Sequence, residues 1–154
     1  MVCKLSDVED FAHLVGHRFP GAVVSVPEHF SWLWSDSVGA RPKGGSAHPS
    51  IAYPLGLRGA GLRIDEILAI VGAGREDGVL LGECGFELHR PLRPEVAYEG
   101  SGGIVAVERK RGARAGVFDL VRFEVRLREE SGEEAVRCSY TWVVPRGGGD
   151  DAAG

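Results

Sequence analysis

The most informative segment of the chain reads Phe86-Glu87-Leu88-His89-Arg90-Pro91-Leu92-Arg93-Pro94. Apolar and polar residues alternate in its first half, and two prolines follow, which cannot continue the hydrogen bonding of a central strand. The segment therefore predicts a strand that ends at a sharp corner. Because long alternating runs follow it, the pattern is typical of a curved antiparallel sheet wrapped around one buried segment.

Three runs alternate regularly. Within 79–90, 117–127 and 135–144, apolar residues recur at every second position, with charged or polar residues between most of them. Such a period of two predicts strands that bury one face and expose the other.

A fourth run, 96–109, is interrupted by Gly100, Gly102 and Gly103. Glycines inside a strand indicate a bulge or the close approach of another backbone. Hairpin turns are expected at 111–116 and 130–133. The four runs are therefore predicted to form a meander.

The first half of the chain predicts helices and one short strand. Ser6 and Glu9 form a capping-box pattern, which predicts a helix over 6–15, and Val23–Val26 resembles a short strand. Pro27 is suited to the first turn of a second helix. The helical period places Phe30, Leu33, Trp34 and Val38 near one face of that helix.

Ile64, Ile67, Leu68 and Val71 keep helical spacing, so a third helix is expected across 62–71. The glycines at 56, 59 and 61 just before it indicate close backbone packing or a bend. A curved sheet that covers a helix buries the apolar surfaces of both. The predicted class is thus α+β, with a curved antiparallel sheet of about five to six strands around a helical segment.

The 154 residues are enough for one domain with an ordinary core, placed here at 1–146. The glycine-rich tail 147–154 is expected to be disordered. The net charge of −4 argues against nucleic-acid binding. No apolar run is long enough for a membrane span, and the start has no signal-peptide pattern. Cys3, Cys84 and Cys138 predict neither disulfides nor a metal site, which favours a cytoplasmic protein.

Four segments together resemble the MaoC-like hydratases and dehydratases, which have the hot-dog fold. They are 86–94, 107–112, 118–125 and 134–144, and the resemblance extends over about 48–146. Within that family the chain is most similar to the N-terminal half of two-domain (R)-specific enoyl-thioester hydratases, which accommodates the acyl chain. Subunits of heterodimeric hydroxyacyl dehydratases look similar.

The resemblance implies a subunit of an acyl-thioester hydratase or dehydratase, with a substrate carried on coenzyme A (CoA) or acyl carrier protein. It implies no cofactor, and a dimer, either with itself or with a catalytic MaoC-like chain. The family's catalytic half has an Asp-x-Asn-Pro-x-His motif. Here His48 is retained, while Lys43, Gly45 and Ser46 replace the Asp, Asn and Pro. A lysine cannot replace a carboxylate base without a large fall in its pKa.

His48 is accordingly the candidate catalytic residue, and a structural role before a turn is its alternative. Candidate substrate-binding residues are Gly59 and Gly61 through their backbone N–H groups, and Trp32 and Trp34 along an acyl tunnel. Packing alone would also explain these four residues. A basic patch could dock CoA phosphates or an acyl carrier protein, or could be a solvated hairpin tip; it comprises Arg109, Lys110, Arg111 and Arg114.

Three other functions stay open on the sequence. The chain could be an autonomous homodimeric dehydratase that uses His48, or a non-catalytic module that binds an acyl group or carrier protein. It could also be a hot-dog thioesterase, for which Asp65 and Glu66 would supply the carboxylate on the helix.

Overall fold

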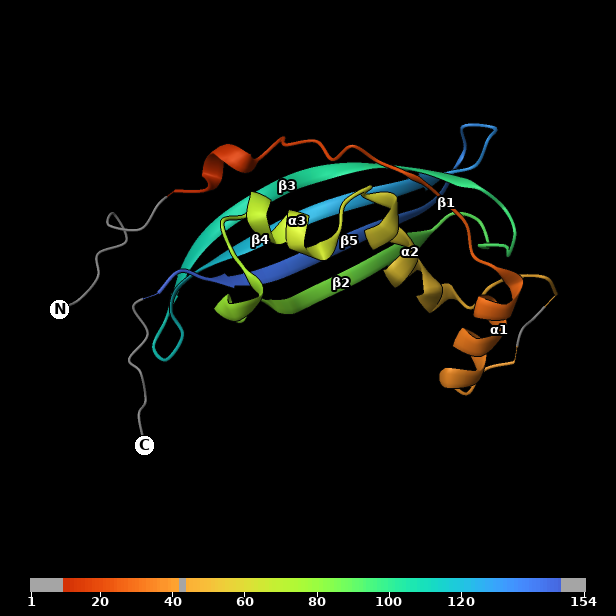
Figure 1. Ribbon diagram of the computed structural model, residues 1–154, viewed down its shortest axis with the longest axis horizontal. Coiled ribbons are helices and arrows are strands. Elements are labelled where there is room, and N and C mark those ends of the chain that lie inside the picture. Colours follow the sequence, from red (N-terminus) through yellow and green to blue (C-terminus); the bar gives the residue numbers. More distant parts are fainter. Residues whose placement is uncertain (1–9, 42–43, 148–154) are drawn as a thin grey trace.

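The computed structural model describes residues 10–41 and 44–147 (Figure 1). Strands and helices of these residues confirm the α+β class. The strands are β1 (Val23–Val24), β2 (Leu80–Leu88), β3 (Tyr98–Gly112), β4 (Gly116–Arg128) and β5 (Glu134–Pro145). The α-helices are α1 (Glu28–Ser37), α2 (Ala52–Gly59) and α3 (Ile64–Ile70), and three short 3-10 helices are η2 (Ala12–Leu14), η3 (Pro49–Ile51) and η4 (Arg75–Asp77).

The strands form a single antiparallel sheet in the order β1-β3-β4-β5-β2. Strands β3, β4 and β5 form a meander, as predicted. Strand β2 pairs with β5 and not with β3, so the predicted pairing of the first two strands was wrong. The corner at 89–97 carries the chain across the ends of β5 and β4 instead. Its prolines prevent the tight hairpin that direct pairing would need.

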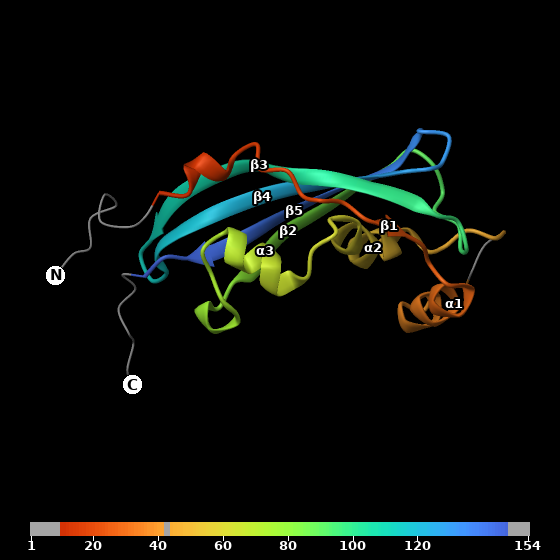
Figure 2. The ribbon, with the colours of Figure 1, turned by 45° about the horizontal axis from the view of Figure 1, so that its top comes forward.

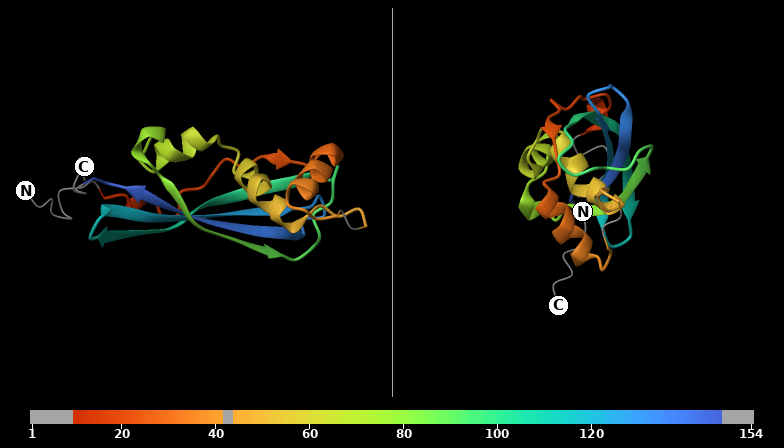
Figure 3. Two further views of the ribbon diagram at one scale, coloured as in Figure 1. Left: turned by 90° about the horizontal axis from the view of Figure 1, so that it is seen from below. Right: turned by 90° about the vertical axis from the view of Figure 1, so that its right-hand side faces the viewer.

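Helix α2 lies against the concave face of the sheet, and the three α-helices lie on the same side (Figure 2 and Figure 3). A side chain at Gly56 would come within 2.3 Å of the Tyr140 hydroxyl, and one at Gly59 within 2.6 Å of Leu127. The backbone of α2 therefore approaches β4 and β5 as closely as packing allows. This helix was not predicted as one, because its glycines and Pro54 lower helix propensity.

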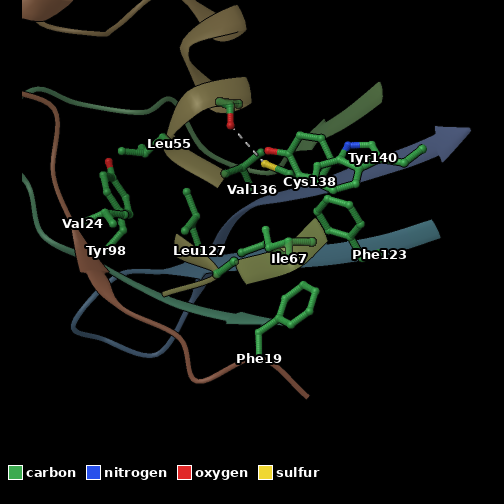
Figure 4. Packing of buried hydrophobic residues seen from close by; sticks show 14 of the residues in the cluster. Phe19, Val24, Leu55, Ile67, Tyr98, Phe123, Leu127, Val136, Cys138 and Tyr140 are labelled. Atoms are coloured by element: carbon green, nitrogen blue, oxygen red, sulfur yellow. Dashed lines mark hydrogen bonds between the residues drawn. The ribbon is translucent and has the colours of Figure 1, made fainter. Parts of the chain in front are cut away.

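The core lies between α2, α3 and the concave face of the sheet. Phe123 stacks on Tyr140, with ring centroids 5.0 Å apart, and meets Trp142 edge-on at 5.1 Å (Figure 4). The Tyr140 hydroxyl donates to the Tyr53 carbonyl at 2.7 Å. Burial raises the pKa of Tyr140 and raises that of the Cys138 thiol to about 11, so both groups stay neutral and structural.

Strand β2 is the exposed edge of the sheet. None of its nine residues is buried, although its alternating pattern predicted one buried face. The pattern was misleading because a strand at an edge has a neighbour on one side only, and helix α2 contacts β2 at few positions, so that Phe86 is half-buried against the core. Leu80, Leu81 and Leu88 are among the exposed large apolar residues.

Helix α1 lies beyond the end of the sheet (Figure 1). It buries Ser31 and Ser35, whereas Phe30, Leu33 and Val38 are exposed. The predicted apolar face is thus not the buried one. The Glu95 carboxylate accepts the N–H of Glu28 at 2.7 Å and so caps the first turn, where Pro27 offers no side-chain acceptor.

Several expectations concern residues outside the described ranges. The predicted helix over 6–15 falls partly there, and its described part contains η2. The tail 147–154 falls there except for Gly147. Among the described residues, no helix combines the length and the apolar character that crossing a membrane requires.

Candidate functional site

A cavity of about 760 Å³ opens between the end of α1, the segment before α2 and the corner after β2. Its size falls within the usual range for small-molecule sites, and its walls are more apolar than polar. The lining residues are Ser35, Ala40, Arg41, Ser46, Ala47, His48, Pro49, Leu88, His89, Arg90, Pro91 and Leu92. A backbone hydrogen bond of 2.7 Å from Ala47 to Leu92 ties two of these walls together.

His48, the predicted catalytic residue, lies in the wall of this cavity. It caps η3, and its Nδ1 atom lies 2.8 Å from Ser50 Oγ and 3.3 Å from the Ser50 backbone nitrogen. The indole N–H of Trp34 donates to Ser50 Oγ at 2.9 Å. A chain of hydrogen bonds thus runs from α1 to the imidazole.

Ser35 is a buried polar group at the same cavity. The residue is 1% exposed, and its hydroxyl has no hydrogen-bond partner among the described residues. Buried hydroxyls are nearly always paired, because an unpaired one costs free energy. A polar atom of a ligand in the cavity would give this hydroxyl a hydrogen-bond partner.

Cationic residues stand around the cavity, and its described lining contains no Asp or Glu. His89 is paired with Glu134 at 3.2 Å, and Arg90 forms ion pairs with Glu129 and Glu133. Arg41 is exposed and makes no ion pair with a described residue. It is therefore the cation of this cavity that a ligand could engage.

Neither glycine predicted to bind substrate presents an N–H group at a helix start. Gly59 ends α2 and packs on β3 and β4. Gly61 donates its N–H to the Arg58 carbonyl at 3.0 Å and has a φ of 75°, with the Gly21 backbone where a side chain would be. The geometry gives both glycines packing roles.

The two tryptophans predicted to line an acyl tunnel do not line the cavity. Trp32 points to solvent and is 57% exposed. Trp34 is half-buried and contributes indirectly, through its hydrogen bond to Ser50.

The predicted basic patch lies at the other end of the sheet. From Gly100, level with the cavity end, β3 runs to Gly112, a distance of roughly 40 Å. Arg109 pairs with the buried Asp119 at 2.9 Å, which raises the pKa of Arg109, and Lys110 pairs with Glu108. Arg111 and Arg114 are exposed at the hairpin. One ligand cannot bridge this patch and the cavity of the same chain.

The carboxylates considered for a thioesterase are already engaged. Asp65 pairs with Arg75, whose hydrogen bonds lower the pKa of Asp65, and Glu66 accepts the backbone N–H of Arg63 at 2.7 Å. Both lie on α3, outside the cavity lining. Within the described residues, no three Cys, His, Asp or Glu side chains gather as a metal site.

Sequence reasoning missed Ser35, Arg41 and Ser50 at this site. Ser50 follows His48 by two residues, a spacing at which a hydroxyl can reach the imidazole, so a local signal was present. Ser35 gave no such signal, because the sequence does not show that the face of α1 with Ser35 is the buried one.

The sequence matches no protein-family model and no curated protein. Solved structures do match. One is the ChsH1–ChsH2 complex from Mycobacterium tuberculosis, with a TM-score of 0.67 and 16% identity over 92% of both chains. Another is the HadBC complex, a 3R-hydroxyacyl-ACP dehydratase of the same organism, with a TM-score of 0.63 and 14% identity over 82% of this chain and 92% of that one.

The unliganded R-hydratase PhaJ1 from Pseudomonas aeruginosa matches with a TM-score of 0.57 and 16% identity over 91% of this chain and 88% of that one. At these identities the comparisons establish the architecture. The chain has the hot-dog fold seen in solved MaoC-like dehydratases and R-hydratases, as its sequence predicted.

Proposed function

We propose that the chain is a subunit of a hydro-lyase that acts on acyl thioesters of CoA or acyl carrier protein. In this proposal the chain binds the acyl group, and a partner hot-dog chain supplies the catalytic acid–base pair. The substrate occupies the cavity beside His48, and Arg41 meets the negative charge of its carrier.

One observation supports this division of labour: the described lining of the cavity has no carboxylate, and of its two histidines His89 is paired with Glu134 outside the lining, which leaves His48. Dehydration of a hydroxyacyl thioester needs a base for the proton beside the carbonyl and an acid for the leaving hydroxide. His48 alone cannot fill both positions at once. The resemblance to hydratases in which one half accommodates the acyl chain supports the same assignment.

Strand β2 is the edge through which a partner would bind. It is nine residues long, no described strand pairs with its outer side, and all of its residues are exposed or half-buried. Such an edge is a template for pairing with another strand. Because the cavity begins where β2 ends at Leu88, a partner strand added there would lie beside the cavity.

The test uses the purified chain alone with crotonyl-CoA. Calorimetric titration is expected to show binding, while the hydration rate stays at the level of a buffer blank. Efficient hydration by the chain alone would contradict the division of labour. If hydration were then abolished in His48→Ala without a change in melting temperature, the autonomous dehydratase would be the correct function.

A matched variant tests the proposed carrier contact. Arg41→Gln should weaken binding of crotonyl-CoA, whereas Arg58→Gln, an exposed arginine on α2 outside the lining, should not. Equal effects of the two variants would mean that general charge attraction, and not this cavity, holds the ligand.

A further inference from the structure

The hydrogen bonds around His48 fix which of its nitrogens carries the proton. A backbone N–H can only donate, so the bond from the Ser50 nitrogen makes Nδ1 an acceptor. The Trp34 N–H can also only donate, so Ser50 Oγ accepts from the indole. Because Nδ1 is an acceptor, the Ser50 hydroxyl gives its own hydrogen to Nδ1. The neutral imidazole therefore has its proton on Nε2.

The Nε2 atom is the free edge of this ring. None of the described residues forms a hydrogen bond with it, and His48 is one of the residues that line the cavity. A nitrogen that already carries a proton cannot take one from a ligand. In this state His48 can only donate a hydrogen bond at its cavity edge.

Ser35, which also lines this cavity, provides an independent observation. Its hydroxyl is buried and unpaired at the same cavity, in walls that are mainly apolar. Two donors, the His48 Nε2–H and the Ser35 O–H, suit an acceptor oxygen with two lone pairs. A thioester carbonyl has such an oxygen.

We infer that His48 acts as a fixed hydrogen-bond donor to the carbonyl oxygen of a bound acyl thioester, with the Ser35 hydroxyl as a second donor. Ser50 and Trp34 are positioning residues that hold the imidazole in its Nε2–H form. The choice of ligand rests on the proposed function, whereas the protonated nitrogen follows from the hydrogen bonds alone. His48 stabilises charge on the carbonyl and does not serve as the base.

Nitrogen-15 NMR of the full-length chain tests the tautomer directly. Two-bond correlations of the imidazole rings at neutral pH should show His48 with a protonated Nε2 and an unprotonated Nδ1; its signals are assigned by their loss in His48→Gln. A spectrum with the proton on Nδ1 would overturn the inference, whether or not crotonyl-CoA binds.

Two amide variants test the donor. Glutamine places its NH2 group near the position of Nε2, and asparagine places it near Nδ1. His48→Gln should keep the dissociation constant of crotonyl-CoA within about threefold of wild type, whereas His48→Asn should weaken binding about tenfold, the value of one hydrogen bond. Equal losses in the two variants would contradict the donor role.

Ser35→Ala should raise the melting temperature and weaken crotonyl-CoA binding, because it removes an unpaired hydroxyl that only the ligand satisfies. A lower melting temperature with unchanged binding would contradict its role. If the wild-type chain does not bind crotonyl-CoA at all, the proposed function fails and the carbonyl contact fails with it. The NMR spectrum then decides the tautomer by itself.

Discussion

At the scale of single residues, the most consequential charged group is Asp119. It is 1% exposed and receives hydrogen bonds from Arg109 at 2.9 and 3.0 Å and from Arg146 at 2.9 Å. Burial by itself would raise the pKa of this carboxyl, but the two guanidinium groups hold it below its usual value of 3.8. Asp119 on β4 thus links β3 to the segment that follows β5, at the hairpin end of the sheet.

Asp119→Asn should destabilise the fold by about 3 kcal/mol at pH 7, because it leaves two arginines without their shared carboxylate. Since the folded pKa is depressed, the stabilisation is complete above pH 3.8 and is lost as the pH falls through the folded pKa. Urea unfolding at several pH values measures this.

The unfolding free energies of wild type and Asp119→Asn should therefore converge in acid. Asp36→Asn, which changes an exposed carboxylate on α1, is the matched control and should stay near wild type at every pH. A constant difference between wild type and Asp119→Asn across the acid range would contradict the role of ionisation.

The sequence predicted that the glycines lie at close backbone contacts, but not which secondary structure each glycine belongs to. Gly100 and Gly103 indicated the approach of another backbone, and the structure places the Gly59 and His17 carbonyls there. Gly56 and Gly59 carry the same signal, yet they lie in a helix. Sequence alone could not distinguish a helix that needs close contact from a bend, because both favour glycine.

At the scale of elements, α1 depends on a residue far away in the sequence. Within residues 10–41 and 44–147, the only side chain that caps its first turn is that of Glu95, which has a φ of 61°. Left-handed backbone is unfavourable for a residue with a side chain, so the corner holds Glu95 in place against this cost. The α1 helix in turn brings Ser35 to the cavity and the Trp34 indole to Ser50.

Glu95→Ala should lower the unfolding free energy by about 1 kcal/mol, the usual value of a lost cap. It should also weaken crotonyl-CoA binding, because α1 is no longer held against the corner. Glu95→Gln keeps an oxygen acceptor and should retain most of the stability. Urea unfolding and calorimetric titration of both variants provide the measurement; equal losses would indicate that charge, and not the hydrogen bond, matters.

The strand pattern predicted β3, β4 and β5 well because their neighbours are close in sequence, and because β4 and β5 each have one buried face. The same reasoning failed for β2 and α1, where most of the large apolar residues are exposed. An alternating or helical apolar pattern indicates that one face of the strand or helix will be buried. It does not show whether the residues that bury this face belong to the same chain or to a partner chain.

At the scale of the whole molecule, the exposed β2 edge determines how two copies would meet. In an antiparallel pair of β2 strands, the Leu88 end of one chain lies beside the Leu80 end of the other. The hairpin with Arg111 and Arg114 belongs to the Leu80 end of the sheet. The basic patch of one chain would therefore lie on the cavity side of its partner, although it is far from the cavity of its own chain.

Cys84 provides the test of this pairing, because it is exposed at the middle of β2. In a two-fold pair centred on this residue, the two Cα atoms lie about 5 Å apart, within the range of a disulfide. We expect mild oxidation of the chain alone, in a Cys3→Ser background, to give a covalent dimer on a non-reducing gel. Adding Cys84→Ser should abolish it.

The register supplies a stricter control. With Cys84 at the centre, position 80 of one strand faces position 88 of the other and not its own copy. In the background of Cys3→Ser and Cys84→Ser, Leu80→Cys should therefore not cross-link, whereas Leu80→Cys combined with Leu88→Cys should. Cross-linking by Leu80→Cys alone, or none by Cys84 at any protein concentration, would show that β2 is not paired in this way.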